Sequence, residues 1–284
     1  MTMDLDNKLR GRKNVLMCIV SILIMGILLF PLYWILVTSL KTEQEIFQIP
    51  PTLFPTVFNT KSYVAQLGNG DFNMFHSFGN SFLISVSCML ISVILSVPAS
   101  YGLGRYRFFG KKVTTLSFLV TQMLPVSVLL TPMFIMFNKM HLINSPLSAI
   151  LSDATIGIPF SILILKNYFA SIPKELEEAS YIDGCTRFSS FRKIMVPIAF
   201  PGVVVCAIFS FLYAWGDLAY GMTFIQDQEK RPITAGIFNF MGQYGTKWSY
   251  LTAFAVVTII PVALIFIFMQ KYIISGLTSG AVKG

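Results

Sequence analysis

Charged residues are scarce in this chain. They make up 12% of its 284 residues, whereas 55% of the residues are hydrophobic and the mean hydropathy is +0.70. Soluble domains carry about 25% charged residues, because their surface must face water. Much of this chain's surface is therefore expected to face lipid, and its 26 phenylalanines and 14 methionines suit lipid-facing and helix-packing positions.

Histidine and cysteine are too few and too scattered for the sites that they commonly build. The two histidines, His76 and His141, stand alone, so no histidine metal cluster can be assembled. The four cysteines show no C-x-x-C spacing, which excludes the usual disulfide framework and the usual zinc site. We interpret all four as small buried hydrophobic residues: Cys18, Cys88, Cys185 and Cys206.

Nucleotide-binding and catalytic motifs are also missing. The nearest candidate for a phosphate loop, GRYRFFGKK over 104–112, has one residue too many between its glycines and no Ser or Thr after the lysine. The sequence contains no H-E-x-x-H, no G-x-S-x-G and no convergent pair of carboxylates. We therefore expect no enzymatic activity, no metal and no cofactor in this chain, and interpret 104–112 as a basic inner loop.

Long apolar runs dominate what remains. A bilayer core about 30 Å thick needs roughly 20 consecutive apolar residues in a helix. Six stretches reach that length, and Asp153 in the fourth is the only charged residue set well within one of them. Their approximate bounds are 15–37, 77–101, 113–137, 147–169, 195–215 and 251–273. We predict an all-α integral membrane protein with six transmembrane helices.

The first span follows a basic tail and could be mistaken for a signal peptide. It is longer than an h-region of about 7–15 residues and no A-x-A-like site follows it, so we expect an anchor that stays. The expected organisation is an N-tail, a first helix, an external loop, a core with the other five spans, and a C-tail. These parts cover 1–14, 15–38, 39–76, 77–274 and 275–284.

The basic residues predict the orientation. With the N-terminus in the cytoplasm, fifteen of the 21 lysines and arginines fall on the cytoplasmic side and six outside. That distribution agrees with the positive-inside rule, and it explains the net charge of +8 without any affinity for nucleic acid. Several spans contain proline, which could kink helices along a pathway, although membrane helices are rich in proline in general; examples are Pro98, Pro125, Pro132, Pro159 and Pro261.

The cytoplasmic loop 171–197 reads SIPKELEEASYIDGCTRFSSFRKIMVP and predicts two short helices joined by a turn. Ser171 is a candidate N-cap of the first helix, and Pro173 suits its first turn. Gly184 is placed as a left-handed C-terminal cap, and Thr186 can then cap the second helix. Apolar residues recur at helical spacing along that second helix: Phe188, Phe191, Ile194 and Met195.

Two interpretations of this helix pair remain open: an amphipathic element lying on the membrane surface, or a knob that docks into a protein socket. The first helix carries three glutamates near its positive end, Glu175, Glu177 and Glu178, with the apolar Ala179 and Ile182 beside them. An anionic leaflet would repel that acidic helix, which favours docking against a protein.

This loop resembles the EAA motif of ABC importer permeases, in which E-A-A is followed after three residues by glycine and later by I-x-x-P. The matching residues here are Glu178, Ala179, Ser180, Asp183, Gly184, Phe191, Ile194, Pro197 and Pro201. Ser180 and Cys185 replace alanines of the family pattern, and both are small substitutions. The resemblance implies a coupling helix that sits in a cleft of a separate ATPase. There Glu178 would pair with a basic group, Ala179 would keep the surface flat, and Gly184 would permit the tight turn. Phe188 joins this predicted contact set.

Two further segments resemble the smaller permease subunit of maltose-type sugar importers. The C-tail is similar to one that reaches between two ATPase subunits, with Gly276, Leu277, Thr278, Gly280 and Lys283 as implied contacts, although a frayed terminus is the alternative. The external loop 217–250 is similar to one that enters the opened binding protein and helps to displace sugar. Its implied probe residues are Gly242, Gln243, Tyr244, Gly245, Thr246 and Trp248.

The resemblance implies the type I ABC importer permease fold and import of a sugar or oligosaccharide. Its implied partners are a second permease subunit in a heterodimer, an ATPase dimer that binds ATP and Mg²⁺, and an extracellular or periplasmic solute-binding protein. The implied location is a bacterial cytoplasmic membrane, with both termini inside. Two alternatives stay open: a permease for an osmolyte, amino acid or peptide, and a secondary transporter, which would need intramembrane acids.

Three residues are candidates for the transport pathway. An ionisable group within a span is costly unless it faces water or a partner, which singles out Asp153, although it could instead lie near the outer headgroups. Tyr213 and Trp215, at the outer end of the fifth span, could stack on a sugar ring. Their alternative is the interfacial aromatic belt.

Overall fold

The computed structural model describes residues 2–67, 74–242 and 245–278 and divides the chain into two compact units. The first unit comprises Met1–Gly68 with Phe240–Val257, and the second comprises Asn69–Asn239 with Thr258–Gly284. The first contains α1 (Thr2–Ser39), α2 (Glu43–Ile46), α3 (Lys61–Leu67) and a two-stranded antiparallel hairpin. The hairpin pairs β1 (Met241–Gly242) with β2 (Gly245–Thr246), and α13 (Trp248–Thr278) follows it.

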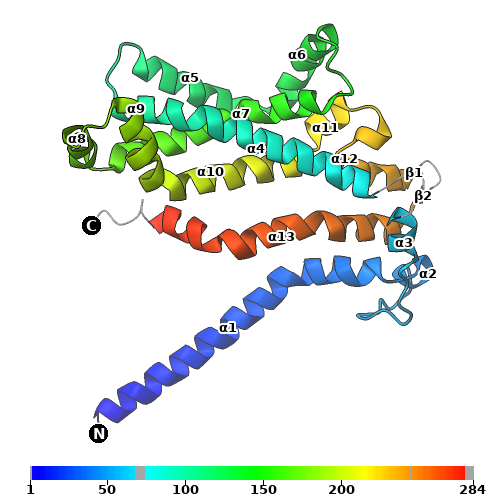
Figure 1. Ribbon diagram of the computed structural model, residues 1–284. Coiled ribbons are helices and arrows are strands. Elements are labelled where there is room, and N and C mark those ends of the chain that lie inside the picture. Colours follow the sequence, from blue (N-terminus) through cyan, green and yellow to red (C-terminus); the bar gives the residue numbers. More distant parts are fainter. Residues whose placement is uncertain (1, 68–73, 243–244, 279–284) are drawn as a thin grey trace. The chain divides into compact units, whose positions relative to one another are not determined.

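The second unit is helical, and the loop 171–197 that is predicted to couple to an ATPase lies in it (Figure 1). Its long helices are α4 (Met74–Arg105), α5 (Lys111–Met123), α6 (Val126–Lys139), α7 (Pro146–Ser171) and α10 (Val196–Gly216). Between α7 and α10 lie α8 (Lys174–Ile182), α9 (Arg187–Ser190) and a π-helical turn (Phe191–Met195). After α10 come α11 (Ala219–Phe224), α12 (Ile233–Gly236) and the 3₁₀ turns Gln228–Lys230 and Ile237–Phe240.

Five helices within the described residues are long and apolar enough to cross a membrane: α1, α4, α7, α10 with the turns before it, and α13. The predicted third span is not one continuous helix, and this corrects the expectation for 113–137. It is broken into α5 and α6, whose axes differ by 99°, so a sixth span exists only if the bent pair counts as one. The break falls at Pro125, because proline has no amide hydrogen to donate and forces Leu124 into an extended conformation with ψ 123°.

The packing of α4, α7 and α10 forms the centre of the second unit. Small residues allow this close approach, as in other membrane helix bundles. A Cβ atom on Gly157 of α7 would lie 2.7 Å from Oγ of Ser92 on α4 and 3.1 Å from Oγ of Ser210 on α10. Cys88 and Cys206 are buried in this packing, as expected. Cys18 is exposed on α1 and Cys185 is only partly buried, so the expectation that all four cysteines are buried was wrong for these two.

A hydrophobic cluster closes the end of the bundle that carries α8 and α9. It joins the C-terminal ends of α4 and α7 to the start of α10, and its members are buried. They are Val97, Tyr101, Leu165, Phe169, Ile172, Met195, Ala199 and Cys206. Because this cluster reaches from the helix ends to the π-helical turn, α8 and α9 rest on a packed platform.

Candidate functional site

The loop predicted to couple to an ATPase folds as two helices joined by a turn, which confirms that local prediction. We call α8, the turn after it and α9 the elbow, residues 174–190. Gly184 has φ +84°, a left-handed conformation that glycine adopts without strain, and the amide of Cys185 donates to the carbonyl of Ser180 at 2.9 Å. The hydroxyl of Thr186 accepts a hydrogen bond from the amide of Ser189, so Thr186 caps α9 as expected.

The start of the elbow corrects one expectation. Ser171 does not cap α8, because it belongs to the end of α7, where its hydroxyl donates to the carbonyl of Tyr168 at 2.8 Å. Pro173 occupies the N-cap position of α8 instead, without a side-chain cap. Proline restricts the preceding Ile172 to an extended conformation, with ψ 130°, so one residue pair both ends α7 and starts α8.

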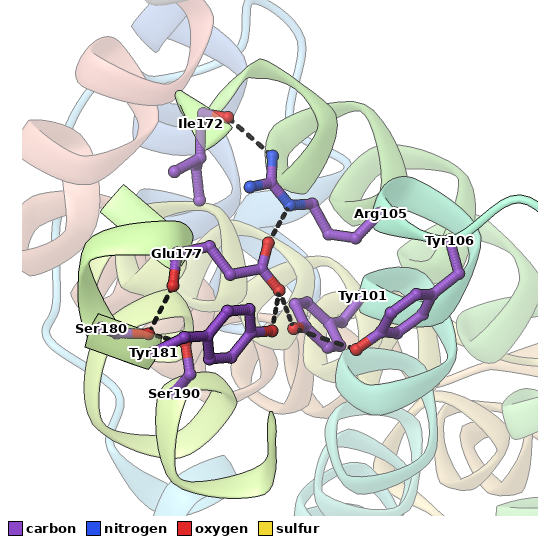
Figure 2. Close-up of polar contacts among 8 residues, drawn as sticks. All are labelled: Tyr101, Arg105, Tyr106, Ile172, Glu177, Ser180, Tyr181 and Ser190. Carbon is purple, nitrogen blue, oxygen red and sulfur yellow. Dashed lines mark hydrogen bonds and ion pairs between the residues drawn. The ribbon is translucent and has the colours of Figure 1, made fainter. Parts of the chain in front are cut away.

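A buried ion pair fastens the elbow to α4, as Figure 2 shows. Nε of Arg105, the last residue of α4, donates to Oε2 of Glu177 at 2.6 Å. The other carboxylate oxygen, Oε1, accepts from the hydroxyls of Tyr101 and Tyr181. Nη1 of Arg105 also donates to the carbonyl of Ile172 at 2.8 Å, so the connection between α7 and α8 is bonded to α4 as well. We call Tyr101, Arg105, Glu177 and Tyr181 the latch.

The latch buries one of the glutamates of α8 that were predicted to be exposed. Three exposed glutamates were expected on the first helix, but Glu177 is only 8% exposed, whereas Glu175 and Glu178 are exposed. Burial raises the pKa of Glu177, and the hydrogen bonds from Tyr101, Arg105 and Tyr181 more than offset it, so its pKa lies below the usual range. Glu177 is therefore a carboxylate at neutral pH, and it balances the buried guanidinium of Arg105.

The outward face of the elbow is acidic and apolar. Ile182 is 87% exposed and Phe188 70% exposed, and Glu178 and Ala179 lie beside them on the surface. Helical spacing accounts for the division, because residues 178 and 182 share one face of α8 while residues 177, 180 and 181 share the other. Large apolar side chains at such exposure, bordered by carboxylates, are typical of an interaction surface.

Only some of the residues predicted to contact the ATPase are exposed. Glu178, Ala179, Asp183, Gly184, Phe188 and Pro197 lie at the surface. Ser180 is 1% exposed, and its hydroxyl lies 2.6 Å from that of Ser190, so it connects α8 to α9 and does not reach a partner. Phe191 and Ile194 are partly buried, and the Phe191 ring packs on Tyr101 with 4.8 Å between ring centroids.

Sequence reasoning missed the latch. Arg105 was counted only as a charge that orients the protein, and Tyr101 and Tyr181 were given no role. One signal was available: Tyr101 with Arg105, and Glu177 with Tyr181, are each four residues apart and therefore share a helix face. Nothing in the sequence joins the two pairs, because Glu177 lies 72 residues after Arg105.

The three pathway candidates lie inside the helix packing. Asp153 is 0% exposed, and neither of its carboxylate oxygens has a hydrogen-bond partner among the described residues. Trp215 is 2% exposed, its Nε1 donates to the carbonyl of Thr258, and its ring packs between Phe78 and Phe211. Tyr213 is partly buried. Trp215 thus faces neither lipid nor an open pathway in this conformation, and the pathway roles of all three stay predictions.

The other two predicted contact segments are described only in part. In the outer loop, Gly242 pairs with Gly245 and Met241 with Thr246 across the hairpin, and Trp248 begins α13. Gln243 and Tyr244, at the tip, lie outside the described residues. Gly276, Leu277 and Thr278 form the last turn of α13, so this helix extends into the predicted C-tail, while Gly280 and Lys283 lie outside the described residues.

Comparison with known proteins places this architecture. Residues 96–279 match the family described as "Binding-protein-dependent transport system inner membrane component". The chain is 33% identical over 256 residues to the sulfoquinovosyl glycerol transport system permease protein SmoH of Agrobacterium fabrum, covering 90% of this chain and 89% of SmoH. It is 30% identical to the diacetylchitobiose uptake system permease protein DasC of Streptomyces coelicolor, covering 90% of this chain and 92% of DasC.

Solved structures show the same fold. A chain of a bacterial ABC transporter that imports the acidic polysaccharide alginate matches with a TM-score of 0.77 at 22% identity, covering 92% of this chain and 98% of that chain. A chain of the MetNI methionine ABC transporter matches with a TM-score of 0.55 at 18% identity, covering 72% of this chain and 94% of that chain. The family match covers more than half of the sequence and includes the latch and the elbow. The chain therefore belongs to the binding-protein-dependent transport system inner membrane components, the permease subunits of ABC importers, and has their type I fold.

Proposed function

We propose that this chain is one permease half of a carbohydrate importer, with the elbow as the point at which a separate ATPase drives it. The names of its relatives support a sugar cargo: SmoH is described as a transporter component for sulfoquinovosyl glycerol, DasC for diacetylchitobiose and AraQ for arabinooligosaccharides. The fold alone does not choose the cargo, because a methionine importer shares it.

The observation that carries the proposal is the combination of an exposed docking face with a buried latch. The outward face presents Ile182 and Phe188, whose exposure to water is unfavourable, next to the carboxylates of Glu178 and Asp183. A socket that buries the apolar side chains and carries basic groups would satisfy both features. An ATPase subunit with such a socket is the proposed partner.

The latch gives this docking face a mechanical connection to the membrane helices. A helix held only by flexible connections would absorb a displacement in its own hinges. Here the Glu177 carboxylate ties α8 to Arg105 at the end of α4, and Arg105 also bonds to Ile172 between α7 and α8. Because α4 packs along α7 and α10, a movement of the elbow is expected to move these helices together as a rigid body.

The remaining partners follow from the same assignment. We propose a second permease subunit, an ATPase dimer that binds ATP and Mg²⁺, and an external solute-binding protein that delivers the sugar. The elbow and both termini would lie in the cytoplasm, in agreement with the charge distribution of the loops. The C-tail, with Lys283, would reach the ATPase, and the hairpin loop would meet the binding protein.

Site-specific crosslinking tests the docking role. In a variant freed of its four native cysteines, a cysteine replaces Ala179 or Ile182, and a matched control places it at Asn167, which is exposed on α7 at the same end of the bundle. The two elbow positions are expected to crosslink to the co-expressed ATPase subunit, and the control is not. If Asn167→Cys crosslinked as well as Ile182→Cys, the elbow would lose its special role. Saccharide-stimulated ATP hydrolysis, measured with the binding protein, would identify the cargo, and stimulation by amino acids alone would contradict the sugar assignment.

A further inference from the structure

A cavity of about 900 Å³ opens at the elbow end of the bundle, beside the connection from α4 to α5. The start of α5 and residue 166 of α7 line it together with that connection. Most of its wall is apolar. Phe108 and Phe109 come from the connection, and Leu116 and Leu119 follow from α5. The Phe109 side chain is fully exposed, which costs free energy in water and suits contact with lipid chains.

Every charged residue that lines this cavity is basic. Four cations line it, Arg107, Lys111, Lys112 and Lys166, and no acidic residue does. The ion pairs Arg105–Glu177 and Lys230–Asp227, in the described part of the chain, involve none of these four. Helix α5 also begins here, without a side-chain cap, so the positive end of its dipole adds to the field. Four cations gathered without a counter-charge favour binding of an anion.

We propose that this cavity binds one anionic phospholipid of the inner leaflet. Its phosphate would lie among the four lining cations, and its acyl chain would follow the apolar wall formed by Phe109, Leu116 and Leu119. A free phosphate ion would match the cations but would gain nothing from that wall, whereas a lipid matches both. The orientation rests on the proposed function, which places the elbow end in the cytoplasm, where the leaflet carries anionic lipids.

The site adjoins the latch, so a bound lipid has a route to the coupling step. Arg107 lies two residues beyond Arg105, which holds Glu177. A headgroup that orders residues 106–110 would fix the segment that follows Arg105 at the end of α4. Anionic lipid is therefore expected to increase the number of sugar molecules imported per ATP hydrolysed.

The test uses the complete transporter in vesicles of phosphatidylcholine that contain a photoactivatable phosphatidylglycerol as a minor component. The labelled peptides of this chain are identified by mass spectrometry. The test variant is Arg107→Gln/Lys111→Gln/Lys112→Gln. The control, Arg192→Gln/Lys193→Gln, removes exposed cations from the π-helical turn outside the cavity. Labelling within residues 106–119 is expected to fall roughly fivefold per cation removed in the test variant and to stay unchanged in the control.

Each other outcome overturns the proposal. Equal labelling in test and control variants would mean that the cations do not select the lipid. Competition by inorganic phosphate as strong as that by unlabelled phosphatidylglycerol would assign the cavity to a free anion. If the test variant lost the ATPase or the second permease during purification while labelling stayed unchanged, the basic face would be a protein contact. These results leave the proposed function standing, because elbow crosslinking to the ATPase is measured separately.

Discussion

Replacing Glu177 with glutamine should uncouple ATP hydrolysis from transport. The substitution keeps the size of the side chain and removes its charge, which leaves the guanidinium of Arg105 buried without a counter-ion; the side chain of Arg105 is only 6% exposed. Removing one partner of a buried ion pair costs about 3–5 kcal/mol. We expect the lower end, because the glutamine oxygen can still accept from Nε of Arg105 while its amide group faces the hydroxyls of Tyr101 and Tyr181, which can accept.

A loss of about 3 kcal/mol shifts the equilibrium between a closed and an open latch by more than a hundredfold. The elbow would still dock, since Glu178, Ala179 and Ile182 are unchanged. The ATPase would therefore continue to hydrolyse ATP, but the movement of the elbow would reach α4 less often. The assay measures uptake of the saccharide and hydrolysis of ATP in the same proteoliposomes with saturating binding protein, and the expected result is a fall in their ratio by at least about tenfold.

Two further variants make this prediction decisive. Glu175→Gln makes the same change at an exposed position of α8, outside the latch, and should couple like the wild type. The reversed pair Arg105→Glu/Glu177→Arg should recover part of the ratio that each single substitution loses, as a double-mutant cycle requires for directly interacting groups. If Glu177→Gln and Glu175→Gln had the same uptake per ATP in assembled complexes, the latch would not transmit the movement of the elbow.

The remaining predictions concern the latch in acid, the turn and the helix packing. The pKa of Glu177 is lowered on folding, so its contribution to stability is present above about pH 4.5, the usual pKa, and is lost as the pH falls through the pKa of the folded state. The thermal midpoint of the complex should therefore drop in that pH range. The drop should be smaller in Glu177→Gln, which has no carboxylate to protonate. Gly184→Pro should abolish uptake while membrane insertion persists, because proline cannot reach φ +84° and has no amide hydrogen to donate to the carbonyl of Tyr181. Normal uptake by this variant would contradict the prediction. Gly157→Leu should lower the thermal midpoint, because even a Cβ at this position would lie 2.7 Å from Oγ of Ser92, and overpacking costs about 1–3 kcal/mol. The control Gly26→Leu on α1 should leave the midpoint unchanged, because a Cβ there would have no atom within 4 Å.

Local chemistry allowed several features to be read from the sequence. The apolar runs predict membrane helices because a helix satisfies its own backbone hydrogen bonds in lipid. Four of the six runs form single continuous helices close to the expected bounds, and the fifth run forms a continuous α-helix that begins at Val196. The turn at Gly184 and the cap at Thr186 depend on residues within a few positions of each other. The broken third span shows the limit: prolines were expected to kink helices, yet Pro98, Pro159 and Pro261 lie inside continuous helices and only Pro125 separates two of them.

Other features were decided only when distant segments met. Glu177 and Glu178 are neighbours with the same side chain, and nothing local assigns one to the latch and the other to the surface. The choice follows from the way α8 lies against the end of α4, which turns Glu177 toward Arg105 and Tyr101 and leaves Glu178 outside. Likewise Trp215, expected at the membrane interface or on a sugar, is buried between Phe78 and Phe211. The buried carboxylate of Glu177 is stabilised by donors from other segments, and those donors can be located only in three dimensions.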